Sequence, residues 1–314
     1  LFSNLPEEKA VNLFTGASFW RLRKKYEFLN AWLEKQGCLV KVGISMALGY
    51  KKNTQAFLEL YLYLFQYRDY PEDEILAIGM GACGFFERRF EKKWGDSSKY
   101  RELATLWSFH SSEIDHQAEV HLHQVRPLNH PVRRLVSLVK ILTDNRLLGV
   151  TEDLRNIWGS ALLCCKNKKD FTDLQKRFLQ LIPSYEDPYW NTHYLFEIES
   201  RETLLPLIGD ELRKSVLVNT FLPLLYEGIR LRNDIEEIKV FNQLYASISA
   251  PNNSKSRYLR HRFYGRSLKK KILDRSIMEQ GAYQIHRDFC VRYEASCEGC
   301  PFVENYQSST LAYL

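Results

Sequence analysis

The 314-residue chain has no apolar run approaching the roughly 18 residues that a helix needs to cross a bilayer, so we expect no membrane partner. Its 15 glycines and 10 prolines are below average usage, which argues against long disordered or low-complexity stretches. No internal repeat recurs at a fixed period. The chain also lacks a glycine-rich nucleotide-binding loop, a serine-nucleophile elbow and a two-histidine zinc helix. The sequence therefore indicates an ordinary globular protein but no particular reaction.

The seven cysteines are irregularly spaced, and an odd number does not form a secreted disulfide framework. The first residues show no positively charged, apolar leader followed by small residues. We therefore expect a reducing, cytoplasmic location. The chain begins at Leu1 and its first methionine is Met46, so we also expect an N-terminal portion of the protein to precede it.

Apolar residues recur at helical spacing through nearly the whole chain, and strand-like alternation is confined to 120–123. Pro6, followed by two glutamates, predicts a helix start, because proline fits the first turn and acids stabilise the positive end of the helix dipole. Pro223 interrupts an apolar stretch over 210–232 and predicts a kink, because proline removes a backbone donor. We predict an all-α protein: an irregular multi-helix array with short loops and a small cysteine-containing C-terminal element.

The clearest break in the chain is the sequence PNNS at 251–254. It divides the chain into a predicted helical core, residues 1–250, and a segment 251–314 that holds a basic helical stretch and a cysteine- and histidine-containing element. We expect this segment to pack on the core as one unit.

The stretch 255–275 concentrates positive charge in a chain whose net charge is only +6. Its basic residues are Lys255, Arg257, Arg260, Arg262, Arg266, Lys269, Lys270, Lys271 and Arg275. Asp274 is its only acid, and Tyr258, Phe263 and Tyr264 are interleaved. Basic groups at this density would attract a polyanion, and the aromatic rings could stack on unpaired bases. The alternative is a solvated helical face whose aromatic side chains point inward.

The C-terminal element contains His286, Cys290, Cys297 and Cys300 in the pattern H-x3-C-x6-C-x2-C. His286 and Cys290 share one face of a helix, and the gap between Cys297 and Cys300 is that of a metal knuckle. One interpretation is a structural zinc ion held by all four side chains. Another is an iron–sulfur cluster, because C-x6-C-x2-C resembles the cluster loop of the endonuclease III and adenine-glycosylase family. The position of the fourth cysteine of that loop is occupied by Tyr306 here, so four thiolate ligands are not available. The third is that the reduced thiols bind no metal.

A polar connector after residue 110 is rich in histidines and acids: His110, Glu113, Asp115, His116, Glu119, His121, His123 and, just beyond, His130. These side chains could supply an acid/base or metal site. No pair shows the fixed scaffold of a known motif, and histidines in a polar loop are usually solvated.

Several segments carry a resemblance to a known family. They are ALGYKKN at 47–53 with FLEL at 57–60, VRPLNHPVRRL at 125–135, VNTFLPLL at 218–225, and QGAYQ at 280–284 before the C-terminal cysteines. In this order the chain resembles domain of unknown function 2851, an uncharacterised bacterial family. The resemblance implies an all-helical region without an assigned activity. It also implies an upstream segment similar to restriction-endonuclease-like nucleases, so any nuclease chemistry would lie in an N-terminal domain of the same protein, outside this chain.

The resemblance places Arg126, Asn129, Arg133 and Arg134 on a shared segment. They would form either a polar lock between helices or an anion-facing surface. The lock is favoured, because an Arg-Pro-x-Asn segment before a helix can satisfy that helix's free amides and fix its entry angle.

We predict a non-catalytic helical accessory module that supports a nuclease-like domain and contacts DNA or RNA through 255–275 and the cysteine-bearing end, with zinc as its candidate cofactor. The alternative is a protein-interaction scaffold that binds no nucleic acid and uses apolar grooves between its helices. A third hypothesis, an enzyme using the connector histidines, requires His116, His121 and Glu119 to converge in one pocket.

Overall fold

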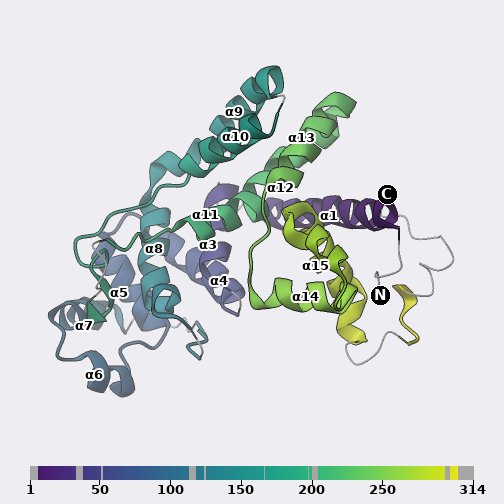
Figure 1. The fold of residues 1–314 in the computed structure, drawn as a ribbon. Coiled ribbons are helices and arrows are strands. Elements are labelled where there is room, and N and C mark those ends of the chain that lie inside the picture. Colours follow the sequence, from purple (N-terminus) through teal and green to yellow (C-terminus); the bar gives the residue numbers. More distant parts are fainter. Residues whose placement is uncertain are drawn as a thin grey trace. The chain divides into compact units, whose positions relative to one another are not determined.

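Helices make up most of the part of the chain that the structure describes (Figure 1). A computed structural model describes residues 6–32, 38–50, 52–112, 118–123, 125–165, 167–196, 198–199, 204–293 and 298–302. Within these residues the only strands are β1 (His193–Leu195) and β2 (Ile198–Glu199), which pair antiparallel, and the alternating stretch 120–123 forms no strand. The predicted all-α class is confirmed. No helix in this part of the chain is long and apolar enough to cross a membrane.

The chain forms two compact units. Unit 1 comprises Leu1–Phe28, Leu154–Phe178 and Phe221–Leu314, and unit 2 comprises Leu29–Asp153 and Leu179–Thr220. The division predicted at residue 250 falls inside unit 1. That 251–314 packs on the core as one unit stays a prediction.

Unit 2 is organised around α8 (Pro131–Thr143), which packs against α3, α4 and α5. Its helices are α3 (Leu39–Leu48), α4 (Thr54–Leu64), α5 (Glu72–Ala82), α6 (Arg88–Trp94), α7 (Ser98–His110), α8 and α11 (Asp210–Val216), with short 3-10 turns η1 (Phe65–Tyr67), η2 (Pro127–Asn129) and η3 (Asn145–Leu148). The apolar stripe of α8, spaced at three and four residues, is buried along its whole length from Val132 to Leu142. Burial of this stripe on three neighbouring helices makes α8 the centre of the unit's core.

Unit 1 contains the long N-terminal helix and the C-terminal helices. Its elements are most of α1 (Glu7–Asn30), α9 (Val150–Cys164) and α10 (Lys168–Gln180), then α12 (Leu222–Arg232), α13 (Ile235–Ser247), α14 (Ser254–Tyr264), η5 (Leu268–Asp274), α15 (Ser276–Asp288) and η6 (Cys290–Arg292). As predicted, α1 begins directly after Pro6 with two acids in its first turn. α15 packs closely on α1 at Gly281, because a Cβ at this position would overlap the backbone carbonyl of Phe14. This contact fixes the α15 face that carries Gln280 and Tyr283 next to α1.

A π-helical turn, η4 (Leu217–Phe221), separates α11 from α12 in the stretch where Pro223 predicted a kink. A π-turn changes the backbone hydrogen-bond register, and here it does so just ahead of the residue that has no backbone donor. The predicted single helix over 210–232 is therefore two α-helices joined by a wider turn.

Candidate nucleic-acid interface

The basic stretch begins with a well-capped helix. Asn253 Oδ1 accepts a hydrogen bond from the Ser256 backbone at 2.9 Å, and Ser256 Oγ accepts one from the Asn253 backbone at 3.0 Å, which forms a capping box. α14 ends at Gly265, whose φ of 56° is a conformation that glycine adopts without strain. After this turn the chain returns, and the Ala250 amide donates to the Asp274 carbonyl at 2.9 Å. The last residues of the basic stretch therefore lie beside the backbone that precedes α14.

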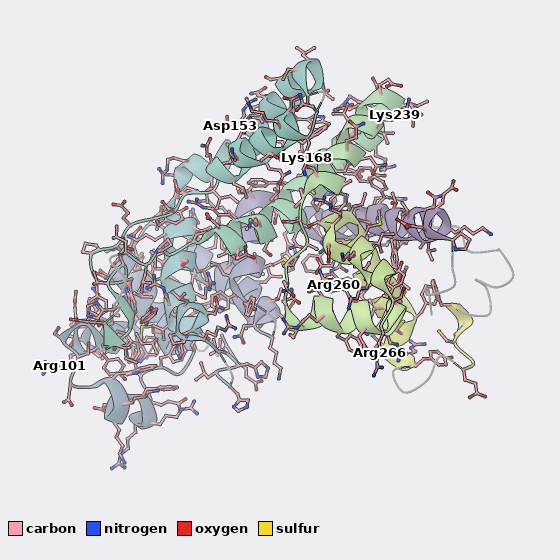
Figure 2. All side chains as sticks on the ribbon, in the orientation of Figure 1. Arg101, Asp153, Lys168, Lys239, Arg260 and Arg266 are labelled. Carbon is pink, nitrogen blue, oxygen red and sulfur yellow. The ribbon has the colours of Figure 1, made fainter. Side chains whose placement is uncertain are left out.

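Most of the predicted binding cations are exposed, and two arginines are not. The exposed residues are Lys255, Arg257, Arg266, Lys270, Lys271 and Arg275, whereas the side chain of Lys269 lies outside the described residues. Arg260 forms an ion pair with Asp274 at 3.1 Å, and Arg262 donates to the backbone carbonyl of Tyr293. Figure 2 labels Arg260 on α14 and Arg266 just beyond it. The only acid of the stretch is thus paired by a half-buried arginine, whereas six cations of the stretch are exposed.

The aromatic residues of the stretch are mostly part of the core. Phe263 and Tyr264 are 0% and 2% exposed, and the Phe263 ring lies edge-on to Phe14 at 5.7 Å. The expectation that these two rings stack on bases is wrong, because they hold α14 against α1. Tyr258 is 41% exposed, and its ring meets His286 edge-on at 5.5 Å. It is the interleaved aromatic residue that remains available at the surface.

Cations from α1 join the basic stretch next to α15. Arg21 Nε and Lys25 Nζ both donate to one oxygen, Gln280 Oε1, at 2.9 and 2.8 Å. Lys255 Nζ lies 4.9 Å from the centroid of the Tyr283 ring, and Arg21 Cζ lies 5.8 Å from the same centroid. Gln280 and Tyr283 are three residues apart on one helical face, so three cationic groups converge there. We call Arg21, Lys25 and Lys255 the cation triad.

A buried carboxyl group lies on the same helix as the acceptor of the cation triad. Glu279 is 1% exposed; its Oε1 accepts from the Tyr283 hydroxyl at 2.8 Å, and its Oε2 has no partner among the described residues. Burial raises the pKa of Glu279 to about 7. Burial also lowers the pKa of Lys25 and of Lys255, and the nearby Arg21 charge lowers both pKa values further. Arg21, Lys25, Lys255 and the buried Glu279 carboxyl group are thus close enough to influence one another's protonation.

The contribution of α1 was not predicted from the sequence. Arg21 and Lys25 are four residues apart on a predicted helix, so a cation pair on one face was visible in the sequence. Nothing in the spacing indicated that this face meets Lys255, which is far along the chain. Only the packing of α15 on α1 brings the three together.

The proposed metal ligands are only partly described. His286 and Cys290 lie near the end of α15 and the start of η6, and both are buried, as is Cys300. Cys297 lies outside the described residues, so the complete ligand set is not placed. Among residues that the structure does describe, no three histidine, cysteine or acidic side chains gather as a metal site would require. The zinc site stays a prediction.

In unit 2, Arg133 is enclosed by backbone carbonyl groups. The guanidinium is 1% exposed and donates to the carbonyls of His193 at 2.7 Å, Leu205 at 2.7 Å and Pro206 at 3.3 Å, as well as to that of Trp190. Burial lowers the pKa of Arg133 to about 10, so the group remains a cation at neutral pH. Arg133 thus ties α8 to Trp190, to the start of β1 and to Leu205 and Pro206.

The neighbouring motif residues have different partners. His130 caps α8, because its Nδ1 accepts from the Val132 amide at 3.3 Å, and burial lowers the pKa of His130 to about 4. Asn129 instead accepts from the Arg134 guanidinium, and Arg126 is exposed. The sequence predicted that the Arg-Pro-x-Asn segment would accept a hydrogen bond from a free amide at the start of α8. The acceptor is instead His130, the residue that follows this segment.

The connector histidines serve separate parts of unit 2. His110 lies 3.2 Å from a carboxylate oxygen of Glu74. The backbone of His121 exchanges two hydrogen bonds with the Asn53 side chain, at 2.7 and 3.0 Å, and His123 is exposed. His116 lies outside the described residues, so the pocket that the enzyme hypothesis requires is not placed.

The structure defines an all-α protein in which six cations of the stretch 255–275 are exposed. The chain belongs to the family described as "Protein of unknown function (DUF2851)", whose model matches residues 1–254. The match includes Arg21, Lys25 and Arg133 and ends just before Lys255. No curated protein and no solved structure matches the chain.

Proposed function

We propose that this chain is a non-catalytic helical module that contacts DNA or RNA through the exposed cations of α14 and η5, in support of a nuclease-like domain elsewhere in the same protein. The observation that carries the proposal is the exposure of Lys255, Arg257, Arg266, Lys270, Lys271 and Arg275 on one folded-back stretch whose only acid is already paired. Exposed lysine and arginine side chains bind phosphates and release counterions, which supplies affinity without sequence preference.

A charge-reversal experiment tests this proposal. Lys270→Glu combined with Lys271→Glu reverses two exposed charges on η5, and Lys168→Glu combined with Lys169→Glu reverses two exposed charges on α10 as a matched control. Binding to labelled single-stranded DNA, duplex DNA and RNA would be measured by fluorescence anisotropy over a series of salt concentrations. If both lysines contact phosphates, the η5 variant should lower the salt slope by roughly 1 to 2 and weaken binding, since each contact contributes about 0.7 to 0.9 to the slope. Equal binding by wild type and both variants would refute the proposal.

A second candidate function, a protein-interaction scaffold, is favoured by apolar side chains at the ends of helices in unit 1. Leu163 on α9, Leu231 on α12 and Ile235 on α13 are 86%, 70% and 68% exposed. Side chains of this size at such exposure are typical of contact surfaces when they gather in a patch. Partners that are retained after nuclease treatment and lost in Leu163→Lys would favour the scaffold.

A further inference from the structure

The cation triad differs from the solvated cations of α14 and η5. Arg21 and Lys25 are half-buried, and their shared acceptor Gln280 is only 6% exposed. Lys255 is exposed and lies at the solvent side of the same group. Two half-buried cations thus share one acceptor on α15, and an exposed third cation lies beside the Tyr283 ring on the same helix.

The acceptor within this group is neutral. Gln280 is an amide, and one amide oxygen accepts from both Arg21 and Lys25. In the part of the chain that the structure describes, neither Arg21 nor Lys255 forms an ion pair with a carboxylate. The charged neighbours are Arg260, Arg287 and Asp288, and Glu279 is the buried carboxyl group. Cations partly removed from water at a neutral acceptor are stabilised strongly when an anion arrives, because the effective dielectric constant there is below that of bulk water.

The ligand that best matches this charge is a phosphate monoester dianion. A lysine and an arginine side chain offer several donors to tetrahedral oxygens, and Tyr283 provides an apolar wall that already holds two of the cations. A bridging phosphodiester carries a single charge and must leave room for the strand on both sides. A terminal phosphate carries up to two charges and needs room for a strand on one side only.

We propose that the cation triad, with Tyr283 beside it, binds a phosphate monoester, either as the terminal phosphate of a nucleic-acid strand or as free phosphate. For the terminal phosphate this inference rests on the proposed function, since the strand would lie along the exposed cations of α14 and η5. For free phosphate it is independent of that function.

The first experiment compares labelled oligonucleotides of one sequence that end in a 5′-phosphate, a 3′-phosphate or only hydroxyl groups. Wild type should bind a phosphorylated strand about tenfold more tightly than the hydroxyl strand, as expected for one added set of charge-assisted hydrogen bonds. Lys255→Glu and Arg21→Gln should each remove this preference. Arg257→Glu is the matched control, because it makes the same charge change two residues further along α14; it should weaken all strands and keep the ratio.

The second experiment titrates the same proteins with inorganic phosphate alone, by calorimetry. Phosphate binding that is lost in Lys255→Glu and kept in Arg257→Glu supports the inference, even if no oligonucleotide binds and the proposed function fails. Oligonucleotide binding with no effect of terminal phosphate, together with no uptake of inorganic phosphate, overturns the inference and leaves the proposed function standing. Urea unfolding of each variant establishes that it is folded, and the exposed position of Lys255 gives one triad variant that should fold normally.

Discussion

Replacing Arg133 with methionine should destabilise unit 2 more than any other single change in the 125–135 segment. Methionine is apolar and flexible enough to occupy much of the space of the arginine side chain. It cannot donate to the carbonyl groups of Trp190, His193, Leu205 and Pro206 that now face the guanidinium. These carbonyl groups lie on two segments that Arg133 connects to α8.

The magnitude follows from two opposing effects. Hydrogen bonds from a charged donor contribute about 1.5 to 3 kcal/mol each, and several are lost together. Burying the guanidinium costs several kcal/mol, which the substitution recovers. The substitution also leaves the carbonyl groups that Arg133 bonded without this donor, at about 1 to 3 kcal/mol for each buried one, so the net loss should be roughly 3 to 5 kcal/mol. Domains of this kind are stable by about 5 to 15 kcal/mol, so the variant should be folded but markedly weakened.

The assay is urea unfolding followed by circular dichroism and by tryptophan fluorescence, because Trp190 belongs to the affected loop. Arg133→Lys should lie between wild type and Arg133→Met, since an ammonium keeps the charge but cannot present the planar fork of a guanidinium. Arg126→Met is the control from the same segment; Arg126 is exposed, and the change should stay within about 0.5 kcal/mol. An Arg133→Met midpoint equal to that of Arg126→Met would refute the reasoning.

Two further predictions concern unit 1. Glu237 is buried and accepts hydrogen bonds from Arg232 and Trp158, and the Arg232 guanidinium lowers the pKa of Glu237. Glu237→Gln should therefore lower the free energy of unfolding by about 1 to 2 kcal/mol at pH 7. In urea unfolding measured across pH, the difference from wild type should shrink as the pH falls through the pKa of Glu237 in the folded protein. A stability difference between wild type and Glu237→Gln that grows as the pH falls would contradict this prediction. Elemental analysis of protein purified without chelator should find one equivalent of zinc, which is lost in Cys297→Ser. Cys164→Ser is the control and should keep the zinc, because Cys164 is an exposed cysteine outside the proposed site. Wild-type protein without metal would reject the site.

The sequence was sufficient for the helical architecture. The apolar stripe of α8 and the Pro6 start of α1 depend on local spacing and on backbone chemistry, both of which a sequence displays directly. The π-turn before Pro223 was foreseen only as a kink, because the missing donor indicates that the helix must adapt but not how.

The contacts of Arg133 and of the cation triad were beyond prediction for a different reason. The acceptors of Arg133 are main-chain carbonyl groups, which every residue possesses, so no residue type marks them in the sequence. Lys255 contacts Tyr283 on α15, and Arg21 and Lys25 reach the same face of α15 from α1, which packs closely on α15 at Gly281. Sequence spacing does not encode contacts of this kind.

The acceptors that surround each cation, rather than the number of cations in a stretch, decide what that cation can bind. Arg133 donates to backbone carbonyls and Arg260 to a carboxylate, so both stabilise the fold and have little capacity left for a phosphate. Arg21 donates to a neutral amide that an anion could replace as acceptor. A count of basic residues in 255–275 treats Arg260 and Lys255 as equal candidates for phosphate binding and omits Arg21. The contacts instead favour Arg21 and Lys255 over Arg260. Because the family match covers α1 and ends at the first residue of α14, two of the three triad cations, Arg21 and Lys25, come from the matched region, and Lys255 comes from the segment that follows it.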